Sequence, residues 1–278
     1  MTVLLADLHI HTALSPCASR QMLPRNIVRT CMQRGLTMIA ICDHNSAANV
    51  AAVAEAAQRE TGTALKVIPG IEVTTREEVH VLGLFPALRC ALTVSDCVRE
   101  SLPEGKSAQR PTNPAGNNPS SEQWILDSEG RQTGTESRLL AGASNFALEE
   151  AINLFRRHGG IAVAAHVDRR AFSVLGQLGF FPETFRFSAA EISAAGAARA
   201  RRGEVPMEEF QRWGLGVVVL ARLISGIIVN TPANTPKASR RSTFFNFSPK
   251  AKGSTRAVKT GYVWNARIAT AAVDILSA

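Results

Sequence analysis

The chain has 278 residues, of which 45% are hydrophobic and 19% charged, and its formal net charge is +8. This apolar content suffices for a sizeable core and excludes a largely disordered chain. The longest apolar runs fall far short of the ~20 residues that a membrane span needs, so we expect no membrane association. The first residues show neither the basic start nor the small-residue cleavage site of a signal peptide.

Short apolar runs alternate with helical patterns along most of the chain. In chain order we expect strands at 3–7, 36–43, 65–73, 79–85, 161–166, 185–192 and 215–220, and helices at 24–34, 47–59, 146–157, 171–178 and 206–213. This alternation predicts parallel βα units. The stretch 101–137 is dense in Pro, Gly, Asn and Ser and predicts a long surface excursion, which its QWILD segment could anchor to the body.

Five of the six histidines lie at the ends of predicted strands, together with one glutamate. His158 is the exception, because it precedes Gly159 and Gly160 at a helix end and is expected to cap that helix. The C-terminal ends of the strands of a parallel barrel meet on one face, so we expect the others to come together there. This group comprises His9, His11, His44, Glu72, His80 and His166.

The H-x-H pair at the first strand end suggests a metal site. Alternation along a strand places His9 and His11 on the same side. Imidazole nitrogens suit Zn, Mn or Fe ions, and a carboxylate such as Glu72 can bridge two of them. The five cysteines are odd in number and form no C-x-x-C pair, which favours reduced thiols and a cytoplasmic location.

Five motifs resemble those of PHP-domain (polymerase and histidinol phosphatase) proteins, and they occur in that family's order. They are DLHIHT at 7–12, CDHN at 42–45, PGIEVTT at 69–75, EVHVLGLF at 78–85 and AHVDR at 165–169. The resemblance implies an α/β fold, a distorted (β/α)7 TIM-like barrel over residues 1–219; an incomplete set of last elements is expected only from the C-terminal departure described below. It also implies two or three bound divalent metal ions.

The resemblance further implies a role for each matching side chain. Asp43 would stand behind the ligands and orient one of them or a bound water, and Cys17, in the SPC segment, would be a further ligand, with an inert loop cysteine as the alternative. Arg169 would clamp a phosphate, whereas Arg170 is expected to be solvated charge. The metal ligands carried over by motif are His9, His11, His44, Glu72, His80 and His166, and Cys17 is added to them as a candidate.

The family's activity would be hydrolysis of a phosphoester by a metal-activated water, on a small phosphate monoester or a nucleotide. One expected feature is missing, however. Relatives end their ligand set with Asp-x-His after a late strand, but no histidine follows His166 and the only aspartate after Asp168 is Asp274. We therefore expect impaired activity in this chain.

The composition also changes near that point. Residues 211–278 carry ten Lys and Arg but one acid, a net charge of +9, against −1 for residues 1–210. Our hypothesis is that an atypical basic tail from about residue 220 arose by a reading-frame slip or a gene fusion. Two alternatives to the phosphoesterase stay open: a nucleic-acid-binding or processing module that uses the tail's basic residues and phenylalanines, and a metal-binding pseudoenzyme. For the tail itself we favour a disordered basic segment without a dedicated partner, because it contains no recognisable binding motif.

Overall fold

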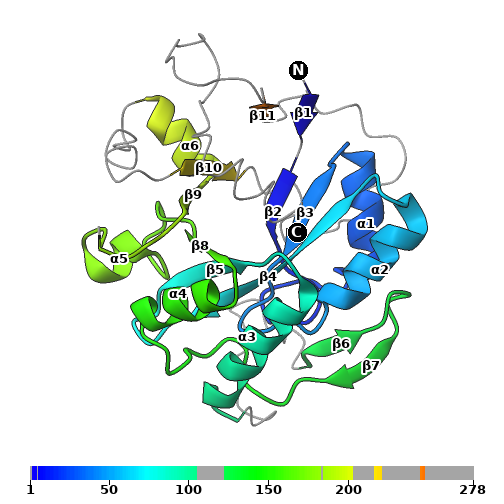
Figure 1. Cartoon of the computed structure of the whole chain (residues 1–278), viewed down its shortest axis with the longest axis horizontal. Coiled ribbons are helices and arrows are strands. Elements are labelled where there is room, and N and C mark those ends of the chain that lie inside the picture. The colour runs from blue at the N-terminus through cyan, green and yellow to red at the C-terminus, as the bar shows by residue number, and fades with distance from the viewer. Residues whose placement is uncertain are drawn as a thin grey trace, which may run out of the picture.

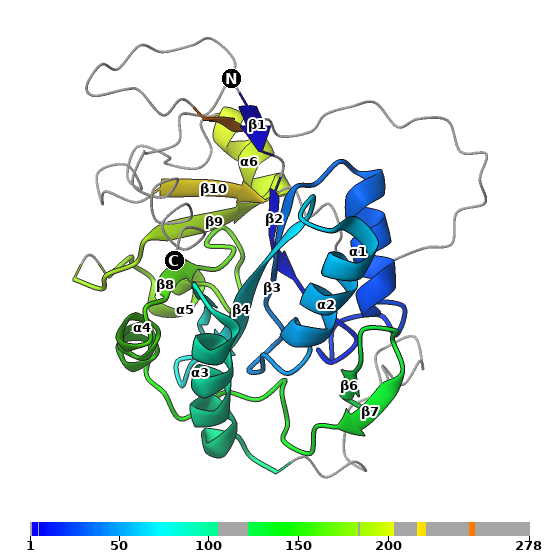
Figure 2. The same ribbon diagram turned by 45° about the vertical axis from the view of Figure 1, so that its right-hand side comes forward.

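The computed structural model describes residues 2–4, 6–104, 122–182, 184–202, 216–220 and 245–247. Seven strands form one sheet in the order β10-β9-β8-β5-β4-β3-β2 (Figure 1). They are β2 (Ala6–Ile10), β3 (Met38–Ile41), β4 (Lys66–Thr74), β5 (His80–Leu84), β8 (Ile161–Ala164), β9 (Ala189–Ser193) and β10 (Gly216–Leu220). The two edge strands, β2 and β10, contact each other, so the sheet curls towards a barrel (Figure 2). The predicted distorted TIM-like barrel is confirmed.

One strand departs from the expected parallel arrangement. β5 runs antiparallel to both of its neighbours, β4 and β8, whereas the other ladders of this sheet are parallel. The connection from β4 to β5 is a short turn, in which Thr75 N–H donates to the carbonyl of Val79, so there is no room for a crossover helix. As a result, β5 begins at the end of the sheet where its neighbours finish.

Helices cover the outside of this sheet. They are α1 (Pro24–Gln33), α2 (Val50–Thr61), α3 (Leu88–Ser101), α4 (Leu148–Arg157), α5 (Val174–Leu178) and α6 (Ala194–Arg201). α1 starts with Pro24, whose fixed φ suits a first helical turn, and His158 caps the end of α4 as expected. α3 and α6 were not predicted. No helix among the described residues is long and apolar enough to span a bilayer.

Two small sheets complete the described structure. β1 (Thr2–Leu4) pairs with β11 (Phe245–Phe247), and β6 (Trp124–Leu126) pairs with β7 (Gln132–Thr135). The strand expected at 3–7 is therefore wrong in its bounds, because β2 of the large sheet runs on to Ile10, whereas Thr2–Leu4 pair in a separate sheet. The β6–β7 hairpin lies in the expected excursion, and Asn49 ties it to the body through Trp124 O and Leu126 N–H. The helix expected at 206–213 and nearly all of the basic tail lie outside the described residues.

The core has an outer layer between sheet and helices and an inner layer inside the curled sheet. Alternate residues of β3 divide between them: Ile39 and Ile41 join the outer layer, and Met38 and Ala40 the inner one. The inner layer contains small and branched side chains, such as Ala165 and Val163. The end of the barrel where β2, β3, β4 and β8 finish carries the polar residues described next.

Candidate metal centre

Five imidazole rings surround the carboxylate of Glu72, which β4 carries into the centre of the site. Its Oε2 lies 3.1 Å from His9 Nε2, 3.2 Å from His11 Nε2 and 3.2 Å from His44 Nδ1. Its Oε1 lies 3.0 Å from His80 Nδ1 and 3.3 Å from His166 Nε2. All six predicted side chains from the strand ends therefore meet at one point.

Local backbone features bring these rings together. The register between β2 and β3 shifts between Asp7 and Ile10, so the alternation of β2 is interrupted just where His9 must turn towards Glu72. Parallel bridging continues past β3, where His44 pairs with Glu72. His80 is the first residue of the antiparallel strand β5, and this reversal places it at the same end as its neighbours.

One side of the cluster is fully buried and the other, which we call the open side, is partly exposed to solvent. The side chains of His9 and His166 are 0% and 2% exposed, and that of Glu72 is 1% exposed. His11, His44 and His80 keep 10%, 14% and 11% exposure. A small molecule can therefore approach the cluster from the side of these last three histidines.

The arrangement of the nitrogen and oxygen atoms in this cluster suits the binding of a divalent metal ion better than it suits hydrogen bonding among the side chains. Glu72 Oε2, His44 Nδ1 and His166 Nδ1 are buried and have no hydrogen-bond partner among the described residues. The short contacts of Glu72 Oε2 thus reflect proximity without hydrogen-bond alignment. Two ligand atoms that share an ion at about 2.1 Å lie roughly 3.0–3.4 Å apart, which matches the separations around Glu72. The groups His9–His11–Glu72 and His44–Glu72–His80 each offer three such atoms within 4.8 Å of one another.

The charges of the cluster are strongly coupled. Burial alone would raise the pKa of Glu72, but His9, His80 and His44 outweigh it and hold that pKa well below its usual range. Burial opposes protonation of His9 too, yet Glu72 and Glu191 raise its pKa to about 10. Burial lowers the pKa of His44 well below its usual value. The lowered pKa of His44 favours its neutral imidazole, which is the form that binds a metal ion.

Asp43 lies behind the cluster and contacts no ring directly among the described interactions. It accepts hydrogen bonds from Thr12 N–H and Oγ1, both at 2.7 Å, and from Ser15 Oγ at 2.6 Å. Ser15 Oγ in turn lies 3.0 Å from His11 Nδ1 and accepts from His44 N–H. Asp43 therefore fixes the loop that carries His11, in keeping with an orienting role.

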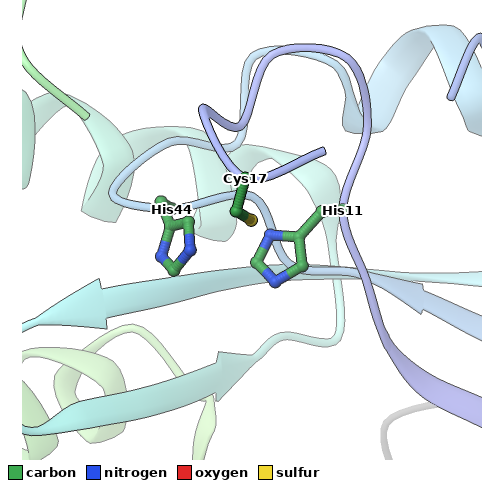
Figure 3. A group of neighbouring side chains, drawn as sticks. All are labelled: His11, Cys17 and His44. Atoms are coloured by element: carbon green, nitrogen blue, oxygen red, sulfur yellow. The ribbon is translucent and has the colours of Figure 1, made fainter. Parts of the chain in front are cut away.

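Cys17 lies beside the open side of the cluster. Its Sγ and a ring nitrogen from each of His11 and His44 lie within 4.8 Å of one another, and Figure 3 shows the three side chains turned towards a common space. Cys17 is exposed and forms no disulfide. These three side chains form a second potential donor group, adjoining the one around Glu72.

Glu191 belongs to the site and was missed from the sequence. It lies on β9, is 1% exposed, and its Oε2 is 2.8 Å from His9 Nδ1. The other nitrogen of His9 faces Glu72, so Glu191 holds this ring from behind, an arrangement common for metal-bound histidines. The sequence does contain a signal for this residue, because Glu191 is the one acidic residue within the expected strand at 185–192.

The two arginines after His166 are both exposed, and neither side chain has a described polar contact. The backbone of Arg169 is hydrogen-bonded on both sides: Arg169 N–H donates to His166 O at 2.9 Å, and Arg169 O accepts from Ser173 Oγ. The geometry thus leaves the predicted phosphate-clamping role of Arg169 as a prediction.

Comparisons with known proteins give consistent results. The family model described as the PHP domain matches residues 7–153. The 5'-3' exoribonuclease Rnm of Salmonella typhimurium (strain LT2) is 34% identical over 91 residues, which make up 30% of each chain. Rnm of Escherichia coli (strain K12) is 35% identical over 81 residues, 28% of this chain and 26% of Rnm. The chain spans under a third of the length of these curated relatives.

Among solved structures, a Bifidobacterium adolescentis protein assigned as a metal-dependent phosphoesterase has the same fold. Its TM-score is 0.50 at 19% identity, and the match covers 77% of this chain and 85% of that one. At this level of identity the likeness shows the fold alone.

Proposed function

The chain belongs to the PHP domain family, and on that premise we propose that it hydrolyses phosphoester bonds with the help of bound divalent ions. The observation that carries this proposal is the convergence of five imidazole nitrogens within 3.3 Å of the Glu72 carboxylate. A cluster of this kind is costly to bury unless a cation organises it. When bound, divalent ions activate water and neutralise charge on a phosphoryl group.

Each side chain then has a defined task. Glu72, in the centre, would hold ions with both carboxylate oxygens, and Asp43 would keep the loop of His11 and His44 in place. Arg169, exposed beyond His166, would bind a phosphate oxygen of the substrate. The ligands we propose are His9, His11, Cys17, His44, Glu72, His80 and His166, and Glu191 orients His9.

The substrate class divides into two candidates. The likeness to Rnm, a 5'-3' exoribonuclease, favours a phosphate that belongs to a nucleotide or to the end of a nucleic acid strand. The alternative is a small phosphate monoester without a base. We also propose that turnover is weak, because the Asp-x-His of relatives is absent from the sequence that follows β10.

The test is hydrolysis by the full chain with added Mn²⁺ or Zn²⁺, assayed on AMP, ribose 5-phosphate and a 5'-phosphorylated RNA oligonucleotide. We expect phosphate or nucleotide release that is lost on chelation and in Glu72→Gln. Glu55→Gln is the matched control, because Glu55 lies on the surface of α2 in an ion pair with Arg59. Release that survives in Glu72→Gln, or metal binding with no release at all, would overturn the proposal; the second result would make the chain a pseudoenzyme.

A further inference from the structure

Phe172 lies at the open side of the metal centre. Its ring stacks on His80 with centroids 4.7 Å apart and planes at 20°, and its carbonyl accepts a hydrogen bond from His80 N–H at 2.9 Å. His80 is one of the three histidines that keep some exposure. A substrate that reaches this side of the cluster therefore arrives next to the Phe172 ring.

The ring is presented to solvent rather than buried. Phe172 is 39% exposed, although a large aromatic side chain gains most from burial. Its backbone has φ +58°, a left-handed conformation that a bulky residue rarely adopts. Such backbone outliers concentrate at ligand-binding and active sites. The chain thus holds the Phe172 ring at the open side of the cluster although both its solvent exposure and its left-handed backbone conformation are unfavourable.

The turn that carries Phe172 is held by its neighbours. Ser173 caps α5 by accepting from Gly176 N–H, and its Oγ also donates to Arg169 O. The backbone on both sides of Phe172 is thus hydrogen-bonded, and its ring lies against His80. The exposed Arg169 and Arg170 precede Phe172 in the sequence by three and two residues. An exposed flat ring, with two exposed arginines just before it in the same segment, suits a ligand that combines a planar base with a phosphate.

We propose that Phe172 is a specificity-determining residue, which stacks on the base of a nucleoside 5'-phosphate whose phosphate lies at the metal centre. This inference rests on the proposed function and names its substrate class. The nucleoside phosphate can be a free nucleotide or the first residue of a strand, since both present the same base and phosphate. Stacking of one base on an aromatic side chain strengthens binding by roughly 5- to 150-fold.

The experiment measures binding instead of turnover. The ligands are phosphonate analogues of AMP and of ribose 5-phosphate, in which carbon replaces the bridging oxygen so that no ester can be cleaved. They are titrated calorimetrically into the full chain with Mn²⁺. We expect the AMP analogue to bind at least 5-fold more tightly than the base-free analogue, and we expect Phe172→Leu to remove that preference. Phe172→Trp, which restores a flat ring, should keep it.

Two controls separate stacking from a structural role. Phe172→Leu keeps an apolar side chain against His80 and leaves the left-handed backbone conformation at position 172 equally unfavourable, so Mn²⁺ and inorganic phosphate should bind as in the unmodified chain. Phe180→Leu is the matched control, because Phe180 is 62% exposed and its ring contacts no cluster histidine among the described residues. A 5'-phosphorylated tetranucleotide with a phosphonate end shows whether the free nucleotide or the strand end binds more tightly.

The outcomes are distinct. Equal binding of the two analogues to the unmodified chain would overturn this inference and leave the proposed function standing. Loss of inorganic phosphate binding in Phe172→Leu would also overturn it, because the ring would then serve only to hold His80. Binding of neither analogue would remove the inference together with the proposed function.

Discussion

His9 is held by a carboxylate at each ring nitrogen, Glu72 at Nε2 and Glu191 at Nδ1. The Glu191 contact fixes which nitrogen carries the proton and thereby leaves the other available for an ion. We expect Glu191→Leu to weaken Zn²⁺ or Mn²⁺ binding by about 10- to 100-fold. Glu191→Gln retains an acceptor oxygen and should weaken it much less.

Competition against a chelating dye measures this affinity. Glu136→Gln is a suitable control, because Glu136 is also a buried carboxylate but bonds to Arg99 and to Arg138 N–H, away from the cluster. Metal affinity that is unchanged in Glu191→Leu would assign Glu191 a purely structural role.

Cys17 can decide which metal ion the centre prefers. A thiolate is a soft ligand that favours Zn²⁺ over Mn²⁺, and its group with His11 and His44 lies at the open side. We expect Cys17→Ser to lower Zn²⁺ affinity by about tenfold or more and to change Mn²⁺ affinity little. A sulfur-to-cobalt charge-transfer band in the Co²⁺-loaded chain should vanish in the same variant.

For this prediction Cys90→Ser is the control, since Cys90 is half-buried on α3 and belongs to none of the donor groups. A Co²⁺ spectrum without the sulfur band in the unmodified chain would contradict the assignment of Cys17 as a ligand.

The residue scale also shows where sequence motifs suffice and where they do not. His9 and His11 are recognisable because a spacing of two identifies them, and His44 and Glu72 because each ends an apolar run. No motif of this kind marks Glu191, and its partner His9 lies 182 residues away in the sequence. Only the folded arrangement of β9 beside the rest of the sheet brings the two together.

At the scale of elements, the antiparallel direction of β5 could not be predicted from its own sequence. Its apolar run looks the same in either direction, and only the tight connection around Thr75 and Val79 indicates a reversal. α3 was missed because its buried positions, such as Val94 and Val98, are mixed with small and polar residues that weaken the periodic pattern. The positions of most other strands and helices followed from apolar periodicity.

Gly70 allows β4 to lie close to β3. A Cβ at this position would lie 2.6 Å from Cys42 Sγ and 2.9 Å from the carbonyl oxygen of Ile41, which belongs to the backbone and cannot move aside. We expect Gly70→Ala to cost about 1–3 kcal/mol of unfolding free energy. Because Glu72 follows two residues later on the same strand, metal affinity should fall as well.

Urea denaturation measures the first effect, and Gly134→Ala is the control. A Cβ at Gly134, on β7, meets Ile125 at an ordinary 3.7 Å, so that change should cost little. Equal unfolding free energies of the two variants would show that β4 can move away from β3 without a loss of stability.

At the scale of the whole molecule, the candidate metal centre joins strands from across the barrel. Its donors come from β2, β4, β5 and the segments that follow β3 and β8, so five neighbouring strands of the sheet meet at Glu72. These donors lie far apart along the chain and converge only in the folded state. Ions that bind there should therefore stabilise folding by linkage, by about 2.7 kcal/mol at a hundredfold excess over Kd.

For a chain of this size such a gain corresponds to a rise in Tm of roughly 5–10 °C. We expect the Tm from a thermal melt to fall by this amount on chelation and to recover when Zn²⁺ or Mn²⁺ is added back. Glu72→Gln should melt at the same temperature with and without metal, since the central carboxylate is then gone. A Tm that is insensitive to chelation in the unmodified chain would mean that the buried histidines are stabilised by Glu72 and Glu191 alone, and that no cation holds the strand ends together.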